Sequence, residues 1–243
     1  MKLKEYIEEI KRFIKDYLST SKLDGFVLGL SGGVDSALVA RLVQEAVGTD
    51  RLFCIMMPCH SCEDDLRDAL ELCHKFQIHH RVIDLTKTFD VLKKEIDDQH
   101  PIHGLSEHNI KVRLRMVTLY AIAQERKSLV LGTDNWDENY VGYFTKYGDG
   151  GCDLLPIVHL TKSEVFEASR MLGVTEKILT KKPTAGLYAN QTDECEMGLL
   201  YADIDAFLLG KNVDDKVKTK IDRMHQMSEH KRNDIPRPQK FIR

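Results

Sequence analysis

Hydrophobic residues recur every three or four positions at the start of the chain. The apolar positions begin at Leu3 and continue to Leu18, with polar residues between them. This spacing predicts an amphipathic helix whose apolar face packs on the rest of the protein. An uninterrupted apolar run at residues 26–28 then predicts a buried strand, and residues 37–43 have the pattern of a second helix.

Strand-like and helix-like segments keep alternating further along the chain. Apolar runs at residues 52–57, 81–85 and 128–132 predict strands, and residues 63–76 and 109–124 have the pattern of helices. Strands that alternate with helices at this spacing predict an α/β fold, a Rossmann-like, doubly wound parallel sheet flanked by helices. Ligands of such folds bind beyond the carboxyl ends of the strands.

The composition is that of an ordinary globular protein. The chain has 243 residues, 42% of them hydrophobic, and a formal net charge of -3. This length suits one domain over residues 1–243, and the mildly acidic balance argues against a general nucleic-acid-binding protein. No apolar stretch is long enough to span a membrane, and the charged N-terminal segment is unlike a signal peptide. We therefore expect a cytoplasmic protein with no nucleic-acid or membrane partner.

The cysteines give only a weak chemical signal. Of six cysteines, Cys59 and Cys62 alone are closely spaced. A single Cys-x-x-Cys pair without a second one is a poor indication of a zinc or redox site. We expect reduced thiols that are mostly structural.

A small-residue loop lies between the strand at residues 26–28 and the following helix. Backbone N–H groups at such a helix start face an anion, and Gly32 and Gly33 let the main chain approach phosphate oxygens closely. The carboxylate of Asp35 would repel a polyphosphate unless Mg²⁺ lay between them. A Walker A lysine and a Gly-x-Gly-x-x-Gly motif are both missing, which argues against GTPase-like and dinucleotide-oxidoreductase sites. The residues predicted to bind the triphosphate are Gly29, Leu30, Ser31, Gly32, Gly33, Val34, Asp35 and Ser36.

A second polar segment follows the strand at residues 128–132. It begins at Thr133, carries several carboxylates, and continues into the glycine-rich residues 142–153. A long polar loop of this kind inside a compact domain is usually functional. We expect it to meet the first loop at the edge of the sheet.

These two segments resemble a known family. Residues 31–36 resemble the pyrophosphate loop of the N-type ATP pyrophosphatases, and residues 144–151, Phe-Thr-Lys-Tyr-Gly-Asp-Gly-Gly, resemble ammonia-dependent NAD synthetases. The resemblance covers nearly the whole chain, through residues 109–116, 155–156, 160–162, 182–187, 191–194 and 229–232. It implies that ATP adenylates the nicotinate carboxylate of deamido-NAD, that pyrophosphate leaves, and that ammonia displaces AMP to give NAD.

The resemblance also implies roles for single residues. ATP would contact Thr133, Lys162 and Thr184 in addition to the first loop. Mg²⁺ would be held by Asp35 and Glu138. Asp149 is the candidate that receives ammonium and takes its proton. Deamido-NAD would contact Arg113, Lys146, Asp153, His230 and Lys231.

Each of these residues also has a purely structural interpretation. Lys162 could simply open a helix over residues 163–172 that Thr161 caps. Arg113 could lie on a solvated helix face, and residues 230–232 could belong to a disordered basic tail. The functional interpretation depends on the joint occurrence of these residues in the order of the family.

Two local departures from the family pattern leave other functions open. Trp136 stands where smaller or polar residues are expected, and the pair Cys59 and Cys62 is unusual. A tRNA-thiolating enzyme would use such thiols for sulfur chemistry, but it should also have a basic RNA-binding surface. A GMP synthetase-like subunit would share the first loop and should lack residues 146–153. A regulatory nucleotide-binding module would not need both Asp35 and Glu138.

The resemblance further implies how the protein is assembled. The first strand begins near Phe26, which leaves no room for the glutamine amidase domain of glutamine-dependent relatives, so free ammonia is the expected nitrogen donor. The family also implies a homodimer in which the helix around Arg113 packs against its partner. Apolar residues on more than one side of that helix are consistent with burial on two sides.

Overall fold

The computed structural model describes residues 1–188 and 191–242 and has a parallel four-stranded sheet at its centre. The strand order is β3-β2-β1-β4, and Val27 of β1 pairs with Phe53 of β2 and Val130 of β4. This parallel sheet flanked by helices confirms the predicted fold class. The strands are β1 (Gly25–Gly29), β2 (Leu52–Met56), β3 (His79–Val82) and β4 (Ser128–Leu131).

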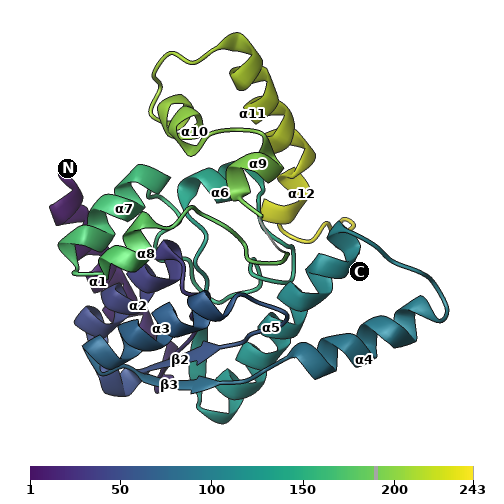
Figure 1. Cartoon of the computed structure of the whole chain (residues 1–243). Helices are drawn as coiled ribbons and strands as arrows, with labels where there is room; N and C mark the ends of the chain where they lie inside the picture. Colours follow the sequence, from purple (N-terminus) through teal and green to yellow (C-terminus); the bar gives the residue numbers. More distant parts are fainter. Residues whose placement is uncertain (189–190, 243) are drawn as a thin grey trace.

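Two helical layers cover the two faces of the sheet (Figure 1). Successive residues of a strand point to opposite faces, so Phe26 and Leu28 pack in one apolar cluster and Val27 packs in the other. The first cluster includes helices α1 (Leu3–Ser21), α2 (Val34–Val47), α3 (Glu63–Phe76), α7 (Lys162–Met171) and α8 (Glu176–Thr180). The second includes α4 (Thr86–Asp97) and α5 (Leu105–Glu125).

A third apolar cluster holds together the helical lobe at the top of Figure 1. Ile204 and Ile221 are fully buried at its centre, and Val141 joins it from below. The lobe consists of α9 (Asp193–Met197), α10 (Tyr201–Leu208), α11 (Asp215–Met227) and α12 (Glu229–Arg232), and it packs on α6 (Trp136–Val141). A 3₁₀ turn, η1 (Thr49–Arg51), leads into β2.

Most of the sequence-predicted elements are confirmed, with one clear error at β3. The prediction placed this strand at residues 81–85, whereas the structure has it at His79–Val82. Among the described residues, it is an edge strand that pairs only with β2, and it is mostly exposed, so it lacks an apolar run. The apolar Ile83 and Leu85 instead pack beneath the sheet after the strand has ended.

The C-terminal residues also differ from the structural alternative considered for them. Residues 229–232 form α12 and dock on the protein through Lys231 and Arg232. They are therefore part of the fold and not a disordered tail. Among the described residues, no helix is both long enough and apolar enough to cross a membrane.

Candidate active site

The first loop is held in shape by its own hydroxyl groups. Leu30 N donates to Ile55 O at 3.0 Å, which continues the β1–β2 pairing into the loop. Ser36 Oγ donates to Gly33 O at 3.2 Å and lies 3.0 Å from Ser31 Oγ. Gly33 is the N-cap of α2 and makes no side-chain cap, so the first N–H groups of this helix are available to an anion.

Gly32 is required by the path of this loop. Its φ is +85°, a backbone conformation that side chains rarely adopt. A Cβ at this position would lie 2.3 Å from the carbonyl oxygen of Asp65 on α3. The loop therefore fits closely against α3 only because this residue has no side chain.

A buried lysine joins the loop to the edge of the sheet. Lys162, the first residue of α7, is 3% exposed, and its Nζ lies 2.7 Å from Asp35 Oδ2 and 2.9 Å from Glu138 Oε1. Asn135 Nδ2 donates to the other oxygen of Asp35 at 2.9 Å. The structure thus brings together three predicted residues from α2, α6 and α7, and it adds Asn135.

The electrostatics of this cluster are set by burial and by the shared contacts. Burial lowers the pKa of Lys162, but the negative charges of Asp35 and Glu138 outweigh it and hold the pKa above its ordinary value. Burial raises the pKa of Glu138 to about 7, with Lys162 opposing the shift and Asp35 adding to it. Lys162 therefore carries a full positive charge between two carboxylates.

Two further carboxyl groups hold the backbone of Lys162 in place. Thr161 caps α7, with its hydroxyl accepting from Glu164 N, as the structural interpretation proposed. Lys162 N donates to Asp137 Oδ2 at 2.8 Å and to Asp205 Oδ1 at 3.2 Å. The structural and functional interpretations of Lys162 are therefore compatible. Thr161 caps the helix, and the helix start places the side chain of Lys162 between Asp35 and Glu138.

The upper lobe reaches this cluster through a tyrosine that the sequence analysis missed. Tyr201 OH lies 2.9 Å from Glu138 Oε1 and 3.0 Å from Asp193 Oδ2, and its single proton serves one of them at a time. Lys162 Nζ lies 4.6 Å from the centre of the Tyr201 ring. Asp193 belongs to residues 191–194, which carried part of the family resemblance, whereas Tyr201 had no such signal.

Four of the five residues predicted for deamido-NAD form one group. Lys146 Nζ donates to His230 O, and an Arg113 guanidinium nitrogen donates to Lys146 O at 3.3 Å. Lys231 Nζ donates to Phe144 O at 2.7 Å and also to the carbonyl of the neighbouring glycine-rich turn. This group joins α5, the loop after α6, and α12.

Asp153 lies apart from that group. Its carboxylate accepts from Val130 N at 2.7 Å and from Tyr120 OH at 3.0 Å, at the open edge of β4. Its own N–H donates to Val130 O. Asp153 therefore continues the sheet beyond β4, which is a structural role that the sequence did not reveal.

The remaining predicted residues differ in how they are held. Asp149 is exposed, and its carboxylate accepts from Thr145 N at 2.7 Å. Thr133 is half-buried, two residues after the end of β4. Thr184 is exposed, and its hydroxyl accepts from Gly186 N at 3.1 Å.

The three residues that depart from the family pattern have ordinary surroundings. Cys59 is buried and Cys62 is exposed at the start of α3, and both are free thiols. Trp136 is the first residue of α6, and its backbone N–H donates to Leu160 O at 2.8 Å. In the described part of the chain, no hydrogen bond or ion pair joins the side chains of these residues to Lys162, Asp35 or Glu138.

Comparison with known proteins shows the family of the chain. A family profile described as NAD synthase matches residues 6–235. The chain belongs to the NAD synthase family.

Members of this family resemble the chain over its full length. An NH(3)-dependent NAD(+) synthetase of Mesoplasma florum is 46% identical over 244 residues, covering 100% of both chains. The solved structure of an NMN synthetase from Francisella tularensis has a TM-score of 0.93 at 39% identity and covers 98% of this chain and 99% of that one. An NH3-dependent NAD synthetase from Campylobacter jejuni has a TM-score of 0.81 at 30% identity, covering 99% and 100%.

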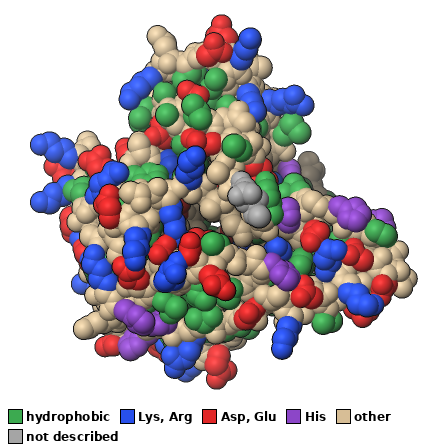
Figure 2. Space-filling view, in the orientation of Figure 1, with side chains coloured by type: hydrophobic (Ala, Val, Ile, Leu, Met, Phe, Trp, Pro, Cys, Tyr) green, Lys and Arg blue, Asp and Glu red, His purple; other side chains and the backbone are tan. Residues whose placement is uncertain are grey.

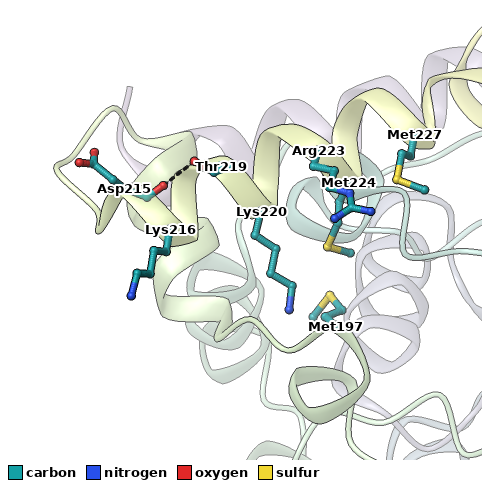
Figure 3. A pocket seen from close by; sticks show the side chains of 8 residues that line it. All are labelled: Met197, Asp215, Lys216, Thr219, Lys220, Arg223, Met224 and Met227. Carbon is teal, nitrogen blue, oxygen red and sulfur yellow. Dashed lines mark hydrogen bonds between the residues drawn. The ribbon is translucent and has the colours of Figure 1, made fainter.

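An open groove of about 700 Å³ lies outside this NAD synthase-type site, between α9 and α11 (Figure 3). Met197 and Met224 form part of its apolar floor, and Lys220 extends along it. None of its lining residues is among the predicted site residues. The groove is therefore separate from the Lys162 cluster.

Replacing Gly32 with Ala should destabilise the protein and weaken ATP binding. Gly48 provides a matched control, because its φ of +86° is nearly the same but nothing lies within 4 Å of an added Cβ. Gly48→Ala should cost about 1–3 kcal/mol of stability through backbone strain alone. Gly32→Ala should cost more, because the clash with Asp65 O is added. Urea unfolding and ATP titration measure both effects, and equal losses in the two variants would contradict this view of the loop.

Proposed function

We propose that this chain catalyses the ATP-dependent amidation of deamido-NAD by ammonia, giving NAD, AMP and pyrophosphate through an adenylated intermediate. The observation that carries the proposal is the meeting of Asp35, Glu138 and Lys162 beside a loop with free helix N–H groups. Membership of the NAD synthase family and the nearby cationic group around Lys146 and Lys231 support it.

The proposed reaction explains why these residue types are needed. A carboxylate is a poor electrophile, so the nicotinate oxygen first attacks the α-phosphorus of ATP, and pyrophosphate leaves with the electron pair of the broken P–O bond. Negative charge then builds on the leaving phosphates. The N–H groups at the start of α2 and the ammonium of Lys162 would stabilise that charge.

The same cluster fits Mg²⁺ brought in with ATP. Asp35 and Glu138 already converge on one positive centre, the Nζ of Lys162. In the described part of the chain, no three His, Cys, Asp or Glu side chains come together to hold a metal on their own. Two carboxylates completed by phosphate oxygens are a typical Mg²⁺ arrangement, and the ion would neutralise charge on the triphosphate.

Nicotinate mononucleotide is a second candidate acceptor. The solved structure described as an NMN synthetase has a TM-score of 0.93 with this chain, against 0.81 and 0.79 for two described as NAD synthetases. The mononucleotide carries the same nicotinate carboxylate but lacks the adenylate half of deamido-NAD. The two acceptors would therefore share the adenylation chemistry and differ only in the contacts of that second half.

The rival functions receive less support. Figure 2 shows acidic and basic side chains interspersed over the visible face, without the single basic surface that an RNA-thiolating enzyme would need. The thiol of Cys59 is buried, and burial raises its pKa, which makes it a weak nucleophile. Residues 146–153, which a GMP synthetase-like subunit should lack, contact α5 and α12 through Lys146.

We also propose a cytoplasmic homodimer that uses α5. All six cysteines are free, which suits a reducing compartment. Val117 of α5 is 58% exposed and lies one turn after the exposed Arg113. A partner packed on this face would cover Val117 and bring a second subunit next to the Lys146 group.

Acceptor specificity tests the proposed function. The wild type should release pyrophosphate from Mg-ATP with deamido-NAD and ammonium, and NAD should appear in equal amount. Asp35→Asn should lower this rate by at least about a hundredfold, because a carboxylate that would hold Mg²⁺ against the leaving phosphates is lost. Turnover with nicotinate mononucleotide alone would select the second candidate. Turnover only with XMP or tRNA would contradict both.

The affinity for Mg²⁺ should depend on pH through Glu138. The pKa of this carboxyl is about 7, so it is protonated below that pH and cannot bind the ion. Magnesium affinity, measured by titration in the presence of a non-hydrolysable ATP analogue, should therefore weaken as the pH falls from 8 to 6. Glu138→Gln should bind Mg²⁺ weakly at every pH and lose this dependence. An unchanged pH profile in that variant would contradict the role of Glu138.

Placing a charge on the exposed face of α5 should separate the proposed dimer. Val117→Glu buries a carboxylate in the interface, and the subunits should dissociate in analytical ultracentrifugation. Leu209→Glu provides a control, because Leu209 is also exposed, at 46%, but lies just after α10 in the upper lobe. A wild-type monomer, or a dimer that both variants leave intact, would contradict the use of α5.

A further inference from the structure

Two tyrosine hydroxyls are shared among three carboxylates near the candidate metal site. Tyr201 OH lies 2.9 Å from Glu138 Oε1 and 3.0 Å from Asp193 Oδ2. Tyr143 OH lies 3.2 Å from Asp193 Oδ1 and 2.7 Å from Glu196 Oε2. Each hydroxyl has one proton to donate, so three carboxylates compete for two protons. The buried carboxylate of Asp193 has no other donor among the described residues, and it therefore depends on the outcome of this competition.

Asp193 also holds the chain segment that contains Thr184. It is the first residue of α9, and its backbone N–H donates to Pro183 O at 3.1 Å. Pro183 directly precedes Thr184 in the chain. One residue thus contacts Tyr201 through its side chain and the peptide bond before Thr184 through its backbone. Whatever fixes the carboxylate of Asp193 also fixes that peptide bond.

A second branch of the same network reaches the other end of this segment. Gln191 Nε2 donates to Glu196 Oε2 at 2.6 Å, and Gln191 Oε1 accepts from Leu187 N at 2.8 Å. Leu187 O accepts from Nζ of the buried Lys111 on α5 at 2.8 Å. The segment around Thr184 is therefore held on both sides by contacts to buried residues.

We propose that Tyr201 is a positioning residue that couples Glu138 to the segment carrying Thr184. This inference rests on the proposed function, in which Glu138 holds Mg²⁺ and Thr184 contacts ATP. A cation on Glu138 removes that carboxylate from the competition, so Tyr201 OH donates to Asp193 alone. Asp193 is then held more firmly, and its N–H fixes the peptide bond before Thr184.

The coupling has a thermodynamic consequence. A cation at Glu138 favours the arrangement in which Thr184 is held in place, and by linkage a nucleotide bound at Thr184 strengthens cation binding at Glu138 by the same factor. A tyrosine that only filled space in its apolar cluster would affect the stability of the fold but would not link these two sites.

Hydrogen exchange tests the coupling without turnover. With a non-hydrolysable ATP analogue bound, saturating Mg²⁺ should slow exchange of the Asp193 N–H in the wild type by about tenfold or more, because Tyr201 then donates to Asp193 alone. Tyr201→Phe keeps the ring and removes the hydroxyl. At Mg²⁺ concentrations that saturate this variant, the magnesium effect should disappear.

Tyr140→Phe is the matched control for the loss of a hydroxyl. Tyr140 packs against the same apolar cluster, and in the described part of the chain its hydroxyl makes no hydrogen bond. This variant should keep the magnesium effect of the wild type. The proposal is overturned if Mg²⁺ does not slow exchange in the wild type, a result that needs no variant, or if it slows exchange equally in Tyr201→Phe.

A double-mutant cycle tests the link to Thr184 by nucleotide affinity. Thr184→Ala should weaken binding of the Mg²⁺-bound ATP analogue by about tenfold in the wild-type background, because a hydrogen bond to a charged phosphate is lost. In the Tyr201→Phe background the loss should be clearly smaller, since Thr184 is no longer held in position. Equal losses in the two backgrounds would overturn the coupling. Failure of the proposed function is distinct, because a wild type that shows both effects but forms no NAD would contradict only the assigned reaction.

Discussion

The contact of Lys162 with Asp35 and Glu138 joins the parts of the chain that meet at the candidate site. The three side chains come from α7, α2 and α6, and Nζ lies within 2.9 Å of an oxygen of each carboxylate. A buried ammonium without these partners would cost roughly 3–5 kcal/mol, which is a large share of the stability of a small domain. The fold therefore keeps a positive charge beside the phosphate loop because the same charge ties three helices together.

This contact also explains why the upper lobe belongs to the site. Its core is a separate apolar cluster around Ile204 and Ile221, and it reaches the carboxylates through the hydroxyl of Tyr201. α12 supplies Lys231 to the glycine-rich loop on the acceptor side. In the proposed function, the loop after β1 would bind the phosphates of ATP, and the lobe would contribute Tyr201 and Lys231 close to the substrates.

The sequence was informative where local pattern and local chemistry coincide. The helix at residues 63–76 and the loop at residues 29–36 could be predicted because periodicity, glycine positions and a carboxylate all lie within a few residues. The edge strand β3 could not, since exposed strands have no apolar run. The single-domain organisation and the site roles remain predictions.

The contacts made by Tyr201, Asp205 and Asp153 depend on chain segments that are far apart in sequence. The hydrophobic periodicity or motif of a single segment cannot predict contacts with distant segments. The buried Oδ2 of Asp134, for which the described residues supply no hydrogen-bond partner, is likewise visible only in the folded chain.

The proposed reaction proceeds through an adenylated intermediate, which an isotope experiment can detect. Deamido-NAD labelled with oxygen-18 in the nicotinate carboxylate would be converted with Mg-ATP and ammonium, and the products would be analysed by mass spectrometry. Attack of the carboxylate on the α-phosphorus predicts that AMP acquires one heavy oxygen and that pyrophosphate acquires none. Unlabelled AMP, or label in pyrophosphate or in inorganic phosphate, would contradict the account.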